Sequence, residues 1–387
     1  MVVEPKVKGF ICITAHPEGC KESVKRQIAY AKAHAKEGCP KKVLVIGSST
    51  GYGLASRISA AYAGGAATLG IMFERRASGK RTATPGFYNT RAFESFAQED
   101  GLYAKTINGD AFSKEIKDEA IRVIKEDLGK VDMVVYSLAA PRRTAADGTV
   151  YQSVLKTTGY AFTEKSWNVD TDVVSEVTIP SATQEEVEST VKVMGGEDWM
   201  DWMDALKEAD VLADETVTVA YSYIGPELTY PVYNQGTIGM AKKHLYESSV
   251  KITEKYKDAG VKAYVSVNKA LVTQASSAIP IVPLYFSVLY KVMKEKSIHE
   301  GCIEQMVRLF TEKLFVDAPV VDEKGQLRLD DWEMREDVQK EVMELWAQIT
   351  TENIRTLADV DGYWEDFYHL FGFGFDNVDY TQDVEVL

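Results

Sequence analysis

The sequence predicts an α/β fold built on a doubly wound parallel sheet, and two observations indicate it. Short apolar, β-branched segments alternate with helical patterns through the first 140 residues and again after residue 217. Within these segments apolar residues run consecutively, as they do in strands that are buried on both faces. Strands and helices that alternate in this way form parallel sheets covered by helices.

The elements follow from these patterns in chain order. A helix over 21–37 ends at Gly38, Cys39 and Pro40, because glycine and proline stop helices. Four strands come next, at 43–47, 67–74, 102–110 and 131–140, with helices at 54–64 and 112–128 and a loop followed by a helix over 85–99. The rhythm then breaks, because residues 141–183 are polar, Thr-rich and predicted to be irregular.

The second half repeats the rhythm once. Residues 184–209 are predicted to be helical, and strands at 217–225 and 261–267 flank a helix over 236–257. The remainder, to residue 387, is mostly helical with a terminal loop.

The chain is predicted to be one continuous unit with four parts. Its 387 residues could form two domains or one large one, and no linker rich in Pro, Gly or Ser divides them. The first part is an N-terminal extension at 1–40, and the second is a Rossmann-like core in two pieces, 41–140 and 211–295. An insertion at 141–210 covers the substrate site, and a helical C-terminal part at 296–387 packs on the core.

Composition excludes several classes of protein. Lys and Arg number 44 against 58 Asp and Glu, a net charge of −14, which argues against nucleic-acid binding. No apolar run of about 18 residues and no signal pattern occur, so we expect neither a membrane span nor secretion. Four scattered cysteines and five histidines predict reduced thiols in a cytoplasm and no metal site. Without heptads we expect a monomer.

A glycine-rich turn is the strongest motif. Gly47, Gly51 and Gly53 fit G-x-x-x-G-x-G, the short-chain dehydrogenase variant of the dinucleotide turn, with Ser48, Ser49, Thr50 and Tyr52 between them. Glycines let the backbone turn sharply and approach a pyrophosphate at the N-terminus of the next helix. The alternative is a structural turn, but the strand before and the helix after supply the context that nucleotide binding requires.

The ends of the other strands predict the rest of the cofactor site. Phe73 and Glu74 end the second strand, where an acidic residue bonds the adenosine ribose and repels a 2′-phosphate, so NADH is favoured over NADPH. Arg75 and Arg76 follow directly and could hold that phosphate instead. The third and fourth strands end in two further pairs of candidate residues, Asp110 with Ala111 and Leu138 with Ala139.

Two tyrosine–lysine pairs could supply the proton donor of a nicotinamide reductase, with the lysine lowering the tyrosine pKa. Tyr290 and Lys294 have the usual Y-x3-K spacing, with Ser277 upstream, but they lie in an apolar run and are better explained as a packed helix. Tyr233 and Lys242 follow the strand at 217–225, where such a pair belongs.

Two further sets of residues lie near this second pair. Tyr223 ends the strand ten residues before Tyr233, and a buried sheet aromatic is its alternative explanation. Leu271, Val272 and Thr273 follow the next strand, where a nicotinamide carboxamide is normally held.

Several segments carry a family resemblance. The sequences GSSTGYGLASRI, TPGFYN, GDAF, YSLAAPRR, KVMGGEDW, AYSYIG, SSAIP and HEGCIEQ, with the Y-x8-K pair, resemble the trans-2-enoyl-CoA reductase family, which includes the FabV-type enoyl-ACP reductases. The resemblance runs from about residue 1 to 380. It implies NADH-dependent reduction of the 2,3 double bond of trans-2-enoyl thioesters such as crotonyl-CoA, in fatty acid or butyrate-type metabolism. Enoyl-ACP is the alternative substrate.

The resemblance also implies residue roles. Tyr233 is the expected proton donor, Tyr223 lies at the substrate, and Lys242 serves both catalysis and the cofactor. The remaining cofactor residues are the strand-end residues named above, residues 47–52 and residues 271–273. Charge, and not the resemblance, makes Arg142, Arg143 and Lys243 candidates for holding the coenzyme A phosphates, because a protein of net charge −14 needs basic residues at the mouth of such a site. Ordinary solvated surface residues are the alternative explanation. A carbonyl reductase, or an NADH-sensing scaffold without turnover, are the competing hypotheses.

Overall fold

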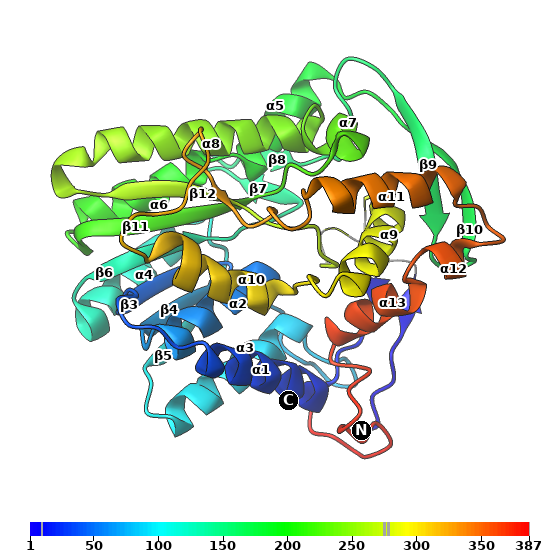
Figure 1. Cartoon of the computed structure of the whole chain (residues 1–387). Helices are drawn as coiled ribbons and strands as arrows, with labels where there is room; N and C mark the ends of the chain where they lie inside the picture. The colour runs from blue at the N-terminus through cyan, green and yellow to red at the C-terminus, as the bar shows by residue number, and fades with distance from the viewer. Residues whose placement is uncertain (9–10, 274–275, 277–278, 387) are drawn as a thin grey trace.

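The computed structural model describes residues 1–8, 11–273, 276 and 279–386. Its described residues form a seven-stranded sheet in the order β13-β12-β11-β6-β3-β4-β5, and every neighbouring pair is parallel (Figure 1). The strands are β3 (Lys42–Ile46), β4 (Ala67–Met72), β5 (Ala104–Asn108), β6 (Val131–Tyr136), β11 (Leu212–Ser222), β12 (Lys262–Val267) and β13 (Leu327–Arg328). The predicted Rossmann-like α/β fold is confirmed.

Helices cover both faces of this sheet because its central strands are apolar on both sides. On β3, Val43 and Val45 join one apolar cluster, whereas Leu44 and Ile46 join another. The first face is covered by α1 (Pro17–Ala33), α2 (Gly51–Ile58), η1 (Ser59–Ala63), α3 (Pro85–Glu99), α10 (Cys302–Arg308) and η6 (Leu309–Leu314). The second is covered by α4 (Lys114–Val123), η2 (Ile124–Leu128), α6 (Glu197–Glu208) and α8 (Thr237–Lys255).

Residues 141–183 differ from the prediction, because they form two antiparallel hairpins instead of irregular chain. These are β7 (Arg142–Thr144) with β8 (Val150–Gln152) and β9 (Phe162–Asn168) with β10 (Val173–Ile179). Their threonines belong to exposed strand faces. The helix predicted over 184–209 is broken into α5 (Gln184–Met194) and α6, since α8 passes so close that a Cβ on Gly196 would lie 2.4 Å from Ser248 Cβ.

The C-terminal part forms a third layer around α9 (Val282–Glu295), together with α11 (Glu336–Gln348), α12 (Ile354–Leu357) and α13 (Val360–His369). It also supplies β13, an edge strand of the sheet that the sequence did not predict. The shorter elements are β1 (Val7–Lys8), β2 (Ile11–Cys12), η3 (Glu227–Thr229), α7 (Tyr230–Tyr233) and η4 (Lys257–Ala259). The two termini meet, since the amino group of Met1 donates to the Val384 carbonyl at 2.8 Å (Figure 1).

No helix in the described ranges is both long enough and apolar enough to span a bilayer.

Candidate active site

A cavity of about 720 Å³ lies at the carboxyl ends of the parallel strands. The strand order reverses between β3 and β6, and ligands of doubly wound sheets bind at this kind of switch point. The glycine turn closes one wall, and two of its glycines have no room for a side chain. Gly47 has φ +84° and a Cβ there would lie 2.1 Å from the Ser137 carbonyl, while a Cβ on Gly53 would lie 1.8 Å from the Gly47 carbonyl.

The structure brings nearly all of the predicted cofactor residues to this cavity. Its walls include Gly47, Ser49, Thr50, Gly51, Tyr52, Phe73, Glu74, Asp110, Ala111, Leu138, Ala139, Lys242, Leu271, Val272 and Thr273. Ser48 requires a correction. Its N–H and its Oγ both donate to the Ile71 carbonyl, at 2.9 and 3.1 Å, so its fully buried side chain faces the sheet and not the cavity.

Glu74 is held in place at the end of β4. Ser49 Oγ donates to its Oε1 at 2.6 Å, and Asn108 clamps its backbone by accepting from the N–H and donating to the carbonyl. The two arginines that follow turn elsewhere. Arg75 donates to the Thr82 carbonyl at 2.8 Å, and the Arg76 guanidinium lies over the Phe87 ring. Neither arginine is among the residues that line the cavity, which leaves the Glu74 carboxylate there.

Lys242 lies two turns into α8 and points into the cavity wall. Its Nζ donates to the Tyr221 carbonyl at 2.8 Å, at the end of β11. Burial disfavours the ammonium and lowers the pKa of Lys242 to about 8.

Tyr223 and Tyr233 lie together behind the cavity and do not form its lining. Their rings pack edge to face with centroids 4.6 Å apart. Tyr223 follows β11 and donates to Glu333 Oε1 at 2.9 Å. Tyr233 ends α7, and its hydroxyl has no hydrogen-bond partner within the part of the chain that the structure describes.

Burial, and secondly the nearby Glu333, raise the pKa of both phenols above the ordinary value. Both are therefore neutral at pH 7. This differs from the expectation that Lys242 lowers the pKa of the tyrosine, because the ammonium is directed at the Tyr221 carbonyl. A neutral Tyr233 whose hydroxyl has no partner in the described ranges is suited to donate a proton or a hydrogen bond.

The alternative pair is structural. Tyr290 is fully buried and its hydroxyl accepts from the Val272 N–H at 3.0 Å, which positions one cavity residue from behind. Lys294 forms an ion pair with Asp359 at 2.7 Å. Ser277, considered with this pair, lies outside the described residues.

Arg143 also requires a correction, because it is buried and already paired. It donates to the Lys192 carbonyl at 3.0 Å and to Asp201 at 3.2 Å, and its guanidinium lies over the Phe112 ring. It therefore joins the insertion to the core and is not available to a coenzyme. Arg142 and Lys243 are exposed and stay candidates.

Sequence reasoning missed the far wall of the cavity. It comes from α1, from the start of α10 and from the end of α13, and α1 lies hundreds of residues before the other two. None of the three helices carries a nucleotide motif. The missed residues of this wall are Ser23, Gln27, Gly301, Cys302, Ile303, Glu304, Asp366, His369 and Leu370. Across the described ranges, no group of three or more His, Cys, Asp or Glu side chains is placed to hold a metal ion.

Rossmann-like oxidoreductases bind a nicotinamide dinucleotide at this point of the sheet, so fold and site define the protein as a reductase or dehydrogenase of that class. Two family models cover most of the chain: "NAD(P)H binding domain of trans-2-enoyl-CoA reductase" matches residues 2–79 and "Trans-2-enoyl-CoA reductase catalytic region" matches 81–315. The chain belongs to the trans-2-enoyl-CoA reductase family, as its motifs indicated.

Individual relatives agree with this membership. A trans-2-enoyl-CoA reductase [NADH] of Ruminiclostridium cellulolyticum is 56% identical over 387 residues, covering 100% of this chain and 98% of its own length. An enoyl-[acyl-carrier-protein] reductase [NADH] of Flavobacterium johnsoniae is 57% identical over 386 residues, covering 99% and 98%. The crystal structure of the Clostridium acetobutulicum trans-2-enoyl-CoA reductase in complex with NADH superposes with a TM-score of 0.97 at 47% identity, covering 100% and 98%.

A third model, "Enoyl reductase FAD binding domain", matches residues 321–384. The buried side chains of this segment, such as Val342, Trp346 and Phe367, pack against α9 in one apolar cluster. The segment contributes Asp366, His369 and Leu370 to the cavity described above, where a flavin would compete with the dinucleotide. The residues present do not fit a separate flavin site, and no step of the chemistry below uses one.

Proposed function

We propose that this enzyme reduces the 2,3 double bond of trans-2-enoyl-CoA thioesters with NADH. The observation that carries the proposal is a dinucleotide cavity with Glu74 at its ribose end and Lys242 near its nicotinamide end. Tyr233, which packs in one cluster with Leu271 and Val272 of the cavity wall, has a hydroxyl without a hydrogen-bond partner among the described residues. The family membership supports the proposal. The comparisons confirm three predictions made from the sequence, namely the enoyl-thioester reductase function, the oxidoreductase class and NADH as cofactor.

Each active-site residue has a separate role in this proposed reaction. The chemistry supplied by bound NADH is hydride transfer to the β-carbon of the thioester. Negative charge then develops on the thioester oxygen, and Tyr233 donates a hydrogen bond to it when that bond is worth most. Lys242 holds the nicotinamide ribose, and Glu74 accepts from the hydroxyls of the adenosine ribose. Tyr223 lies at the substrate, and the α-carbon is protonated directly or through the enol.

The decisive experiment is NADH oxidation by the purified enzyme with crotonyl-CoA. Activity that requires the enoyl thioester supports the proposal. Turnover of a ketone or aldehyde but not of crotonyl-CoA would favour a carbonyl reductase, and NADH binding without turnover would favour a sensing scaffold. The carrier must be measured, because relatives at 56% and 57% identity bear the two different names. Faster turnover of crotonyl-ACP than of crotonyl-CoA would assign the protein to fatty acid synthesis.

The carrier can also be tested at the protein surface. Arg142→Glu with Lys243→Glu is expected to raise KM for crotonyl-CoA about threefold or more at low ionic strength, with less effect in high salt, because exposed charges are screened. kcat should stay unchanged. Lys125→Glu is the matched control, since this exposed lysine lies in η2, just before the amino end of β6 and opposite the cavity. An equal KM across a salt series would remove both residues from the substrate site.

Cofactor choice is expected to depend on Glu74. Its carboxylate repels a 2′-phosphate, so Glu74→Ala should narrow the preference for NADH over NADPH by about tenfold. Steady-state kcat/KM for both cofactors measures this. Asn108→Ala is a useful companion variant, because it releases the Glu74 backbone but leaves the charge. A native preference for NADPH would contradict the role given to Glu74.

A pH effect is expected from Lys242. Because burial lowers its pKa to about 8, the ammonium is present below that pH and is lost as the pH rises through it. kcat/KM for NADH, which reports the free enzyme, should therefore fall above about pH 8. Lys242→Arg keeps its positive charge at every pH measured. In this variant kcat/KM for NADH should no longer fall above pH 8, but its value at neutral pH should be lower than in the unaltered enzyme. A flat profile up to pH 10 would contradict the assignment.

Three further proposals concern the whole molecule. The insertion at 141–210 covers the substrate side of the core. Two of its residues, Pro141 and Met194, line the cavity and support this proposal. The enzyme is a monomer, which light scattering behind a sizing column tests. It acts in the cytoplasm without a nucleic-acid or membrane partner, as its acidic composition and its scattered cysteines suggest.

A further inference from the structure

A buried carboxylate lies directly behind the two active-site tyrosines. Glu333 is completely buried, on the segment that follows β13. Its Oε1 accepts from the hydroxyls of Tyr223, at 2.9 Å, and Tyr285, at 2.8 Å, while its Oε2 accepts from the Ala270 N–H at 2.7 Å. Three donors therefore converge on one carboxylate, and they come from three separate parts of the fold.

This carboxylate is costly to bury, so its charge must be compensated. Burial raises the pKa of Glu333, and the nearby ammonium of Lys269, itself buried, is the main influence that opposes this shift. Three donated hydrogen bonds and a neighbouring cation are the conditions under which a buried carboxylate stays ionised. An ionised Glu333 can only accept hydrogen bonds, so the phenol of Tyr223 must point its proton toward it.

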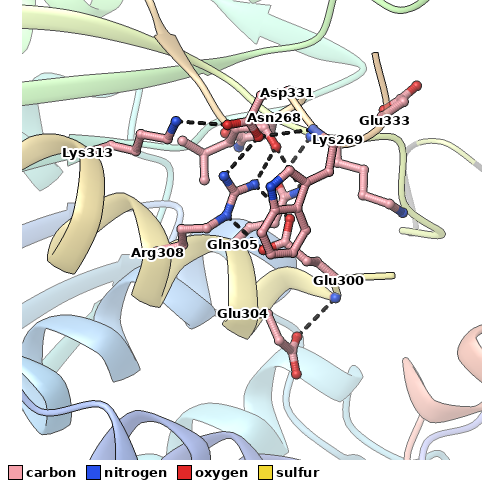
Figure 2. Close-up of polar contacts among 12 residues, drawn as sticks. Asn268, Lys269, Glu300, Glu304, Gln305, Arg308, Lys313, Asp331 and Glu333 are labelled. Atoms are coloured by element: carbon pink, nitrogen blue, oxygen red, sulfur yellow. Dashed lines mark hydrogen bonds and ion pairs between the residues drawn. The ribbon is translucent and has the colours of Figure 1, made fainter. Parts of the chain in front are cut away.

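The segment that carries Glu333 is fixed by a second network, drawn in Figure 2. Arg308 on α10 binds Glu300 through two nitrogens, at 2.8 and 2.7 Å, and reaches Asp331 at 2.8 Å. It also donates to the Leu329 carbonyl. The network therefore places Glu333, two residues beyond Asp331, at the back of the active site.

The two tyrosines differ in one respect that decides their roles. The proton of Tyr223 is used by Glu333, whereas the hydroxyl of Tyr233 has no partner among the described residues. Their rings are in edge-to-face contact, so fixing one ring limits the other. Tyr223 is poorly placed to donate to a substrate while its proton is directed away.

We propose that Glu333 is a positioning residue, which holds the Tyr223 hydroxyl so that the Tyr223 ring braces Tyr233 and Tyr233 is the phenol that donates to the thioester oxygen. This role rests on the proposed enoyl-thioester reduction. Glu333 acts through Tyr223 and touches neither the substrate nor the cofactor.

The test is a double-mutant cycle of Glu333→Gln and Tyr223→Phe, read as the single-turnover rate of NADH oxidation with crotonyl-CoA. The glutamine keeps shape and volume, and its amide oxygen can still accept from Ala270. Glu333→Gln should slow turnover about tenfold, the usual size of a lost bond to a charged group, with the Kd for NADH changed less than twofold. In the Tyr223→Phe background the same change should cost less than about twofold, since the partner is already gone.

Tyr285→Phe is the matched control. It removes the other phenol bonded to the same oxygen of Glu333. Among the described residues the Tyr285 ring is paired with Phe286, and the ring paired with Tyr233 is that of Tyr223, so turnover should fall less than about threefold. Glu333→Asp is the second variant should the glutamine enzyme fail to bind NADH, and it should show the same coupling to Tyr223.

Two results would overturn the proposal. One is an equal slowing by Glu333→Gln with and without the Tyr223 hydroxyl, and the other is a wild-type rate in Glu333→Gln. Failure of the proposed function would look different, because the unaltered enzyme would then bind NADH but not oxidise it with crotonyl-CoA.

Discussion

Tyr233→Phe is expected to lower kcat for crotonyl-CoA by about 10²–10³, the typical cost of losing one donor to a developing oxyanion. Among the described residues its hydroxyl is bonded to nothing, and burial together with Glu333 raises its pKa, so it remains a neutral donor at working pH. The phenylalanine keeps the ring that packs against Tyr223 in the same apolar cluster, so the fold and NADH binding should be kept.

Two measurements make this expectation specific. Kd for NADH from fluorescence titration should be unchanged, and single-turnover rates should fall with kcat, which places the loss in the chemical step. Tyr290→Phe is the control on the rejected pair. It removes the bond to the Val272 N–H and should act on KM for NADH more than on kcat. Wild-type turnover by Tyr233→Phe would mean that Tyr233 is not the proton donor, and Tyr290 or Tyr223 would be the next candidates.

Arg308→Met is expected to be the most destabilising of the substitutions considered, lowering the free energy of unfolding by about 3–5 kcal/mol. The guanidinium and the carboxylate of Glu300 are both almost completely buried, at 6% and 4% side-chain exposure. Removing the arginine leaves Glu300 charged or forces it to take up a proton, since burial already raises its pKa. Chemical denaturation at pH 7 measures the loss.

Arg122→Met is the matched control, because Arg122 also binds two carboxylates, those of Glu119 and Glu126. All three side chains are 39% or more exposed, so this change should lower the free energy of unfolding far less than Arg308→Met does. Similar losses in the two variants would contradict the view that burial makes the Arg308 network strong. The double change Arg308→Met with Glu300→Gln should recover part of the loss, since it removes the buried unpaired charge.

Much of the fold was predictable because its signals are local. Segments such as residues 43–46 are apolar at every position, which indicates a strand covered on both faces. A loop followed by a helix was predicted over 85–99, and the structure makes the whole of that range helical. The hairpins β7–β8 and β9–β10 were missed because their strands have one exposed, polar face and so resemble loops in composition. The edge strand β13 has two residues, too few for any periodicity.

The predicted site was largely a consequence of topology. Once Gly47, Glu74, Asp110 and Leu138 each follow a parallel strand, the sheet must bring them to one edge, and the structure does so. Arg143 shows the limit of that reasoning. Its position after the fourth strand was right for a cavity mouth, but its side chain turns inward to Asp201 and Lys192 of the insertion.

The sequence by itself therefore determined the parallel sheet and the glycine turn, and it predicts Glu74 as the ribose residue and Tyr233 with Lys242 as the catalytic pair, because each of these signals depends on neighbours within about 20 residues. The tertiary structure alone decided which groups surround the tyrosines. Glu333 is 100 residues from Tyr233, and no pattern in the chain marks it. Only packing of the C-terminal segment onto the core carries that carboxylate to the Tyr223 hydroxyl, where burial raises the pKa of both groups.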